Sequence, residues 1–186
     1  MGRRKTLRSE LLACAVEQHG YLTAADVARH AVPAPVLADL VADGELVAAG
    51  AGLYRVEAVP RTPWQRFAGA VLGTGEDAVL SHDAVLALHG LVEHEPDPVR
   101  VTTGSLPRGR AVPDGVELVH RPLPADEVTT YRGIRSTSVA RALLDCRAVL
   151  TAGQLETAAQ QAVDDGLLLR RERHVVLEAL IDLRAR

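Results

Sequence analysis

Helix-start and helix-stop signals between residues 20 and 36 constrain this fold more than any other feature of the sequence. Thr23 and Asp26 stand three residues apart, the spacing of a capping box, in which each side chain hydrogen-bonds a free backbone N–H at a helix start. Pro33 and Pro35 interrupt the helical pattern that follows, and Pro35 suits the first turn of a further helix. This stretch therefore predicts two short helices joined by a tight turn.

The segments on either side complete a small module. An apolar stripe at helical spacing predicts a first helix over residues 7–19, with inward residues Leu7, Leu11, Leu12, Ala15 and Val16. The third helix has a similar stripe, formed by Val36, Leu37, Leu40 and Val41. Segments 45–49 and 53–56 flank a glycine turn and predict a two-stranded hairpin. Helix, helix, turn, helix and hairpin in this order predict a winged helix-turn-helix domain over residues 1–58, whose third helix is the expected reader of a DNA groove.

The outward face of that third helix carries no positive charge. Its residues are Pro35, Ala38, Asp39, Ala42 and Asp43. A helix that reads DNA normally presents Arg, Lys, Asn or Gln to bases and phosphates. Asp39 can accept a hydrogen bond from cytosine, but a carboxylate repels phosphates. The main affinity for DNA must therefore come from other parts of the chain.

Positive charge gathers instead at the amino-terminal end and at two later positions of the first domain. The candidate DNA-binding residues there are Arg3, Arg4, Lys5, Arg8, Arg29 and Arg55. A basic arm of this kind can follow a phosphate backbone or enter a minor groove. The alternative interpretation is an ordinary solvated chain end.

Residues 61–186 predict a mixed α/β domain with a helical tail, so the fold class of the whole chain is α+β. Thr62 and Pro63 are expected to open its first helix, and Ser81 and the Thr137–Ser138 pair to cap two more. The expected extended segments are 78–80, 99–102, 116–119 and one piece around 129–135, and the tail helices are 151–165 and 171–185.

Arginines are frequent in the stranded part of this second domain. They are Arg100, Arg108, Arg110, Arg121, Arg132 and Arg135. We count Arg100, Arg108 and Arg110 among the candidate DNA-binding residues. Because acidic residues are interspersed with them, a normal solvated surface is the alternative.

Several runs of residues resemble the AbiEi family, the antitoxin and repressor component of type IV toxin-antitoxin systems named for phage abortive infection. In the first domain the runs are GYLTAADV at 20–27, LADLVADGEL at 37–46 and GLY at 52–54. In the second domain they are VLSHDAVLALHGL at 79–91 and TSVARALLD at 137–145. The resemblance covers nearly the full chain.

This resemblance implies a bacterial DNA-binding repressor of its own promoter that counters a nucleotidyltransferase-like toxin encoded nearby. Such proteins commonly carry basic residues on the third helix and before the wing glycine, where this chain has Ala38, Asp39, Ala42 and the Ala49–Ala51 turn. The alternative function is a protein-interaction module that keeps the winged-helix fold without direct DNA readout.

Composition limits the partners and the compartment. A net charge of −3 and a pI near 6.2 argue against a surface that binds polyanions everywhere, so DNA contacts must be local. Cys14 and Cys146 lie in apolar helical patterns and are expected to be small buried hydrophobes, which fits a reducing cytoplasm. We see no signal peptide and no stretch of membrane-spanning length.

The sequence offers no enzyme motif. Ser81, His82 and Asp83 are the residue types of a hydrolase triad, but consecutive residues point in different directions and do not form a relay. The spacing of the histidines does not predict a metal site, and no phosphate-binding loop is present. Arg141 and Asp145 stand four apart and are expected to pair on one helix. We therefore expect no catalytic, cofactor-binding or metal-binding residue.

Overall fold

The computed structural model describes residues 2–50, 52–105, 111–168 and 172–178, and shows an α+β protein with two sheets. The chain forms two compact units, which we describe separately. One comprises Met1–Glu76 with Pro107–Asp114, and the other comprises Asp77–Leu106 with Gly115–Arg186. The sequence places a boundary near residue 60, whereas the contacts assign the helix after that point to the first unit.

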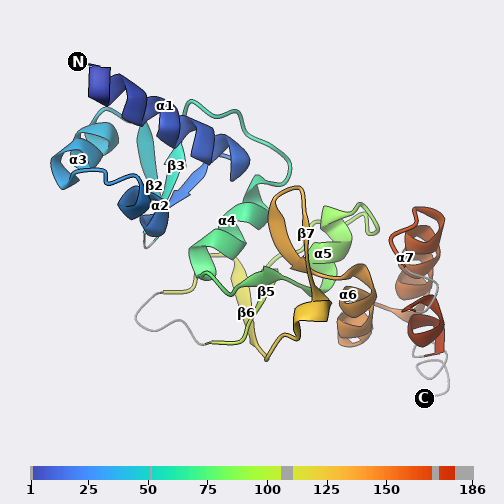
Figure 1. Ribbon diagram of the computed structural model, residues 1–186. Helices are drawn as coiled ribbons and strands as arrows, with labels where there is room; N and C mark the ends of the chain where they lie inside the picture. Colours follow the sequence, from blue (N-terminus) through green and yellow to red (C-terminus); the bar gives the residue numbers. More distant parts are fainter. Residues whose placement is uncertain (1, 51, 106–110, 169–171, 179–186) are drawn as a thin grey trace. The chain divides into compact units, whose positions relative to one another are not determined.

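In its described residues the first unit contains four helices and a three-stranded sheet, which can be followed in Figure 1. Its elements are α1 (Gly2–Glu17), β1 (Tyr21–Thr23), α2 (Ala24–Arg29), α3 (Ala34–Ala42), β2 (Leu46–Gly50), β3 (Leu53–Val56) and α4 (Gln65–Thr74). The sheet order is β1-β3-β2 with antiparallel pairs, so β3 is the central strand. Strand β1 is absent from the sequence-based prediction because three residues are too few to show an alternating pattern.

The capping box forms as the sequence predicts. The Asp26 backbone N–H donates to Thr23 Oγ1 at 3.2 Å, and the Thr23 backbone N–H donates to Asp26 Oδ2 at 2.8 Å. Helix α2 ends at Arg29, and α3 begins at Ala34 with Pro35 in its first turn. The two prolines therefore separate the helices as expected.

The core of the first unit is narrower than the sequence predicts. Its buried residues are Leu11, Ala15, Leu22, Leu40, Leu46, Val56 and Val59. On the described part of α1 the fully buried side chains are Leu11 and Ala15, whereas Val16 is 58% exposed and Leu12 is 39% exposed. Val41 is likewise 39% exposed on α3. The prediction that these three residues face the core is wrong, because a helix packed on a three-stranded sheet buries a narrower stripe than apolar spacing alone suggests.

Helix α4 begins later than predicted. Its N-terminal cap is Trp64 rather than Thr62, and no side chain caps it. The Thr62 hydroxyl lies instead 3.2 Å from Nδ1 of His19. The helix packs closely on β1 at Gly69, where a Cβ atom would lie 2.8 Å from the Tyr21 hydroxyl oxygen. Only a glycine admits this approach without movement of the tyrosine ring.

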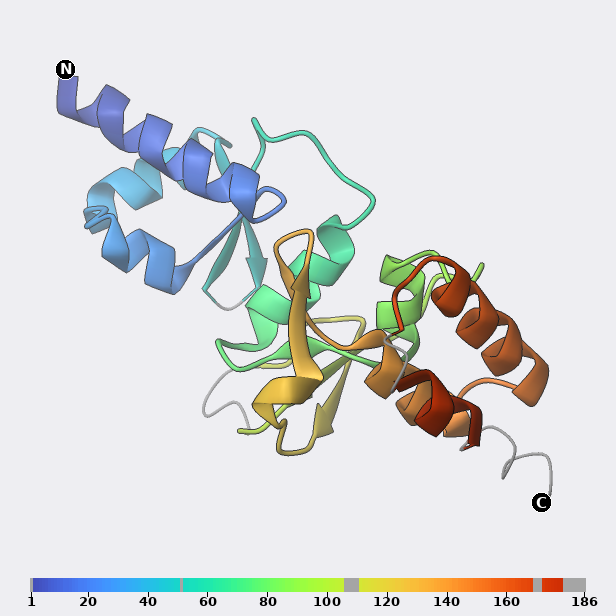
Figure 2. The same ribbon diagram turned by 45° about the vertical axis from the view of Figure 1, so that its right-hand side comes forward.

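The second unit contains a mixed five-stranded sheet with helices (Figure 2). Its elements are β4 (Val79–Leu80), α5 (His82–Leu88), β5 (Val99–Thr103), β6 (Val116–His120), η1 (Ala125–Glu127), β7 (Val128–Tyr131), β8 (Ile134–Thr137), α6 (Val139–Asp145), η2 (Cys146–Ala148) and α7 (Ala152–Asp164). The sheet order is β6-β5-β4-β8-β7. Residues 172–178 form a further helical segment, and the rest of the predicted last helix lies outside the described residues.

Three local predictions in this unit can be compared with the structure. The single extended piece predicted at 129–135 is a hairpin, β7 and β8, with Tyr131 paired to Ile134. Ser138 caps α6 by accepting from the Arg141 backbone N–H, as predicted. Ser81 precedes α5, but its side chain makes no capping hydrogen bond, so that prediction is wrong.

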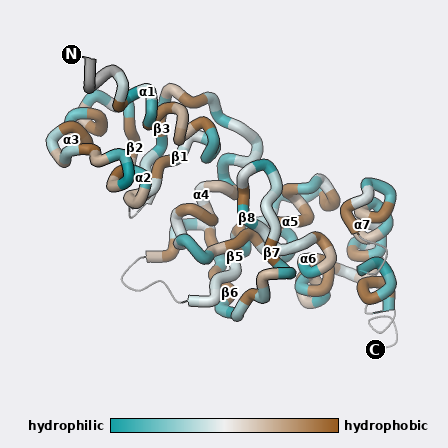
Figure 3. Tube along the Cα trace, in the orientation of Figure 1, coloured by the Kyte–Doolittle hydropathy of each residue, from teal (hydrophilic) through white to brown (hydrophobic). Residues whose placement is uncertain are grey.

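Helix α7 carries hydrophobic and hydrophilic residues in alternation (Figure 3) and buries Leu155, Ala158, Ala159 and Ala162.

Candidate nucleic-acid interface

The basic amino-terminal segment belongs to a helix. Helix α1 begins at Gly2, five residues before the predicted start, so the backbone of Arg3, Arg4 and Lys5 is helical rather than an extended arm. Their side chains lie outside the described parts of the structure. A helical segment does not enter a minor groove as an extended peptide does. The basic residues therefore suit phosphate contacts along one side of a duplex.

Arg8 follows one turn later and has a local counter-ion. Its Nη2 lies 2.6 Å from Oε1 of Glu45, and the two side chains are 53% and 44% exposed. An exposed pair of this kind contributes little to stability, since water and salt screen it. Replacement of the Arg8–Glu45 contact by a contact between Arg8 and a phosphate therefore changes the free energy little.

Arg29 is the most accessible described cation among the candidates. It closes the last turn of α2, its side chain is 66% exposed, and its Nη2 lies 2.9 Å from Oδ1 of the buried Asp26. Burial opposes ionisation of Asp26, but hydrogen bonds from Gln18 and Thr23 and the charge of Arg29 together hold its pKa below the ordinary value. The pair leaves most of the Arg29 side chain in solvent.

Arg55 is not a surface residue, which corrects its place among the candidate DNA contacts. It is 6% exposed, and its guanidinium donates hydrogen bonds to the carbonyl oxygens of Val56 and Val59. A Cβ atom on Gly20 would lie 2.8 Å from its Nη1. The sequence suggested exposure because β1 was not recognised; with β1 on one side and β2 on the other, β3 is buried as a central strand.

The outward face of α3 is as the sequence predicts. Pro35, Ala38, Asp39, Ala42 and Asp43 are all exposed. This face therefore presents two carboxylates and no cation to solvent.

Arg100 is bound by carboxylates of its own unit, which also corrects its place among the candidate DNA contacts. Its Nη1 lies 3.0 Å from both carboxylate oxygens of Asp83, and its Nε lies 3.0 Å from Oε2 of Glu117. Burial disfavours its charge, but these two carboxylates raise its pKa above the ordinary value. A guanidinium held by two carboxylates is not available to a phosphate. Arg108 and Arg110 lie outside the described residues.

A second ion network joins α6 to η1 in the same unit. Arg141 and Asp145 pair as predicted, with Nη2 2.6 Å from Oδ1. Glu127 lies 3.3 Å from Arg141 and 2.9 Å from Arg121, whose other terminal nitrogen is 3.7 Å from Asp145. The sequence predicted only the helical pair, because Arg121 and Glu127 come from loop and turn positions without a periodic pattern.

His82 and Cys14 are half-buried and Cys146 is buried. The His82 ring lies 3.0 Å from the Ser81 hydroxyl, but Asp83 is held by Arg100 and does not orient that ring. Burial lowers the pKa of His82 despite the nearby Asp145. Burial also raises the pKa of Cys146 to about 12, so its thiol stays protonated. Cys14 is half-buried, and burial raises its pKa as well.

No group of three or more His, Cys, Asp and Glu side chains in residues 2–50, 52–105, 111–168 and 172–178 is arranged to hold a metal ion. Within the same residues, no helix has the length and apolar character needed to cross a lipid bilayer.

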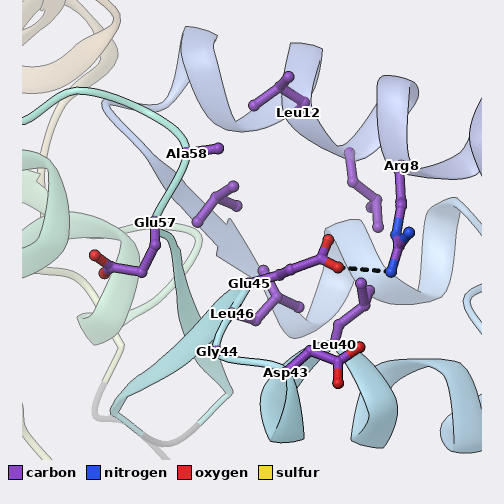
Figure 4. A pocket seen from close by; sticks show the side chains of 11 residues that line it. Arg8, Leu12, Leu40, Asp43, Gly44, Glu45, Leu46, Glu57 and Ala58 are labelled. Atoms are coloured by element: carbon purple, nitrogen blue, oxygen red, sulfur yellow. Dashed lines mark hydrogen bonds and ion pairs between the residues drawn. The ribbon is translucent and has the colours of Figure 1, made fainter.

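A pocket of about 370 Å³ opens beside α1 in the first unit. Figure 4 shows Leu12 and Ala58 on one side of it and Leu40 and Leu46 on the other. Its charged lining residues are Arg8, Asp43, Glu45 and Glu57. The sequence did not predict this pocket, since apolar spacing assigns Leu12 to the core. One signal in the sequence could have indicated it. Apolar residues occupy two neighbouring rows of helix α1, which is more than the small sheet can cover.

Comparisons with known proteins give a likeness among solved structures. No protein-family model and no curated protein matches the chain. Among solved structures, the crystal structure of the RV2827C protein from Mycobacterium tuberculosis is similar, with 17% sequence identity and a TM-score of 0.44. The match covers 94% of this chain and 81% of that one.

Proposed function

We propose that this chain is a DNA-binding antitoxin and autorepressor of a type IV toxin-antitoxin system, as its resemblance to the AbiEi family implies, and that its first unit is a winged helix-turn-helix domain. The observation that carries the proposal is the element order α1, β1, α2, α3, β2, β3 with sheet order β1-β3-β2. A helix, a short strand, two helices and a hairpin that pairs with the short strand form the plan of a winged helix.

The pairing of β1 with β3 supports this interpretation because it links the two helices of the turn to the hairpin. Tyr21 pairs with Arg55 and Thr23 pairs with Leu53. Thr23 is also the cap of α2, so one residue ends the strand and starts the helix. The α2–α3 turn is thereby held on the sheet from which the hairpin extends.

The charge distribution determines which surface meets DNA in this proposal. Helix α3 supplies no cation, and Arg55 and Arg100 are engaged inside their units. Arg3, Arg4, Lys5, Arg8 and Arg29 remain as the phosphate-binding set, and Arg108 and Arg110, which lie outside the described residues, stay candidates beside them. Contact through these residues would position the chain on a duplex, while base recognition by α3 would be limited to short-range contacts.

The repressor half is tested by binding of the full chain to duplexes from its own upstream region. We expect a shift that weakens steeply with salt, because each neutralised phosphate releases counter-ions. A scrambled duplex of equal length and composition separates promoter recognition from general attraction. Absence of binding to the upstream duplex at low salt contradicts the repressor proposal.

The antitoxin half is tested by co-expression with the product of a neighbouring nucleotidyltransferase gene. We expect growth arrest by that product alone and restored growth with this chain. Failure of the chain to restore growth, at confirmed expression of both proteins, contradicts this half.

A protein-interaction module is the second candidate, and the acidic face of α3 favours it. Asp39 and Asp43 would repel a phosphate backbone but would suit a cationic protein surface. A stable complex with a neighbouring gene product, together with no affinity for DNA at low salt, is the result that distinguishes this candidate from the repressor.

A further inference from the structure

The inner side of the pocket beside α1 is formed by apolar residues of the first-unit core. Leu11, Leu40, Leu46 and Val56 line it, and all four belong to the buried cluster of that unit. Leu12 lines it too, although 39% of its surface is exposed. A volume of about 370 Å³ lies in the range of ligand pockets and accommodates more than one aliphatic side chain.

The apolar surface continues past the pocket along α1. Val16 lies four residues after Leu12, one helical turn away, and is 58% exposed. Neighbouring side chains at this spacing form a ridge, which fits into the groove of another helix. The pocket and the ridge together match the pattern by which a helix docks with apolar residues at i, i+3 or i+4.

The charges around the pocket are unbalanced. One guanidinium and three carboxylates line it, and Arg8 is already paired with Glu45 at 2.6 Å. Asp43, at the end of α3, and Glu57, after β3, have no ion-pair partner among the described residues. Figure 4 places Glu57 at the opposite end of the pocket from Arg8. A cationic occupant would therefore place one charge near Glu57, away from Arg8, and another near Asp43.

We propose that this pocket and the adjoining Leu12–Val16 ridge form a docking site for a cationic amphipathic helix of a partner protein. One apolar side chain of the partner enters the pocket, the next packs on Val16, and Lys or Arg residues on the flank meet Asp43 and Glu57. A second copy of this chain is a poorer occupant, because its own pocket rim would bring further carboxylates to the same place. The proposal goes beyond the function proposed above, and its pocket shares Arg8 with the phosphate-binding set.

The probe is a fluorescein-labelled sixteen-residue synthetic helix with leucines at i, i+3, i+4 and i+7 and lysines on one flank. A matched peptide carries glutamates in place of the lysines. Binding to the full chain is measured by anisotropy in low and high salt, and sedimentation of the chain alone reports its oligomeric state. We expect the lysine peptide to bind at micromolar concentration and the glutamate peptide to bind at least tenfold more weakly.

Variants test whether the peptide occupies this pocket. Leu12→Asp should weaken binding at least tenfold, and Asp43→Lys combined with Glu57→Lys should do so at low salt. Val47→Asp is the matched control for an apolar residue, because Val47 is 46% exposed on β2 and does not line the pocket. Asp114→Lys is the control for an exposed acid. Both controls should bind within twofold of wild type, and thermal unfolding verifies that each variant is folded.

Three results would overturn the proposal. The first is equal affinity for the two peptides, and the second is binding that Leu12→Asp and the double lysine variant leave unchanged. The third is a dimer that Leu12→Asp dissociates while wild type binds neither peptide, which would assign the surface to a second copy. Should Leu12→Asp unfold the chain, Val16→Asp on the exposed ridge replaces it. Retained DNA binding in the folded Val16→Asp variant, whose residue lies two helical turns from Arg8 and outside α3, keeps this result separate from a failure of the repressor proposal.

Discussion

The guanidinium of Arg100 holds both carboxylate oxygens of Asp83, with Nη1 3.0 Å from each. Asp83 lies on α5 and Arg100 on β5, so this contact joins a helix to the sheet of the second unit. The Asp83 side chain is 5% exposed and the Arg100 side chain is 19% exposed. Removal of the cation would leave a buried carboxylate without its main partner.

We predict that Arg100→Ala lowers the free energy of unfolding by about 3 kcal/mol, the usual result of breaking a buried pair from one side. The double variant Arg100→Met with Asp83→Leu should recover most of this loss, because no buried charge is then left unpaired and Glu117 is 47% exposed to solvent. Arg147→Ala, at an exposed arginine, is the control and should change stability by less than about 0.5 kcal/mol. Denaturant unfolding measures all three. An Arg100→Ala protein as stable as the control would show that the pair is not structural.

The capping box offers a second prediction, in the first unit. Thr23→Ala removes the acceptor for the Asp26 backbone N–H and should lower the free energy of unfolding by about 1 kcal/mol. Thr23→Ser keeps the hydroxyl and should retain most of the stability. Ser9→Ala, at an exposed position inside α1, serves as the control. Equal stability of the Ala and Ser variants at position 23 would contradict a capping role.

Much of the first unit is predictable from its sequence because local signals determine it. Thr23, Asp26 and Pro35 act on neighbouring backbone groups, and the structure places each of them as predicted. Arg55 shows what local signals miss. Its burial depends on β1, a three-residue strand whose pairing partner lies more than thirty positions away in the chain.

The candidate contact residues were the least predictable part. Nothing in the sequence distinguishes Arg100 from another arginine on a half-buried strand. Its pairing with Asp83 arises because α5 packs against β5 in the folded unit. The pocket beside α1 was equally hidden, because periodicity shows which residues of a helix are apolar but not how wide a stripe the sheet can cover. Tertiary packing, rather than residue type, decided both cases.

Gly20 provides a third prediction, which also tests the position of Arg55. Its φ is +93°, and an added Cβ would lie 2.8 Å from Nη1 of Arg55. Gly20→Ala should therefore lower the free energy of unfolding by more than about 1 kcal/mol, because the backbone conformation and the buried guanidinium both oppose a side chain. Gly153→Ala is the matched control, since its Cβ would meet nothing within 4 Å at the start of α7, and it should be neutral or stabilising. Thermal unfolding of both proteins is the measurement, and a Gly20→Ala protein that melts with the control would contradict the close approach.

His82 gives a prediction for pH dependence. Burial lowers its pKa below the ordinary value of 6.5, so the unfolded chain binds a proton more readily than the folded chain. Its contribution to stability is therefore full above pH 6.5 and is lost as the pH falls below that value. We expect His82→Gln to reduce the fall in stability between about pH 7 and pH 5. His174→Gln, at an exposed histidine, should leave the fall unchanged; an identical pH profile for His82→Gln and wild type would contradict the burial argument.

The central claim is that a winged helix whose third helix carries no cation binds DNA through the basic start of α1. The direct test is the affinity of the full chain for an upstream duplex over a range of salt, compared with the triple variant Arg3→Ala, Arg4→Ala and Lys5→Ala. We predict that the triple variant binds at least tenfold more weakly and that the slope of log affinity against log salt becomes shallower by about 2.7, or 0.9 for each lost phosphate contact. Arg147→Ala should match wild type. An unchanged affinity and slope in the triple variant would contradict the account.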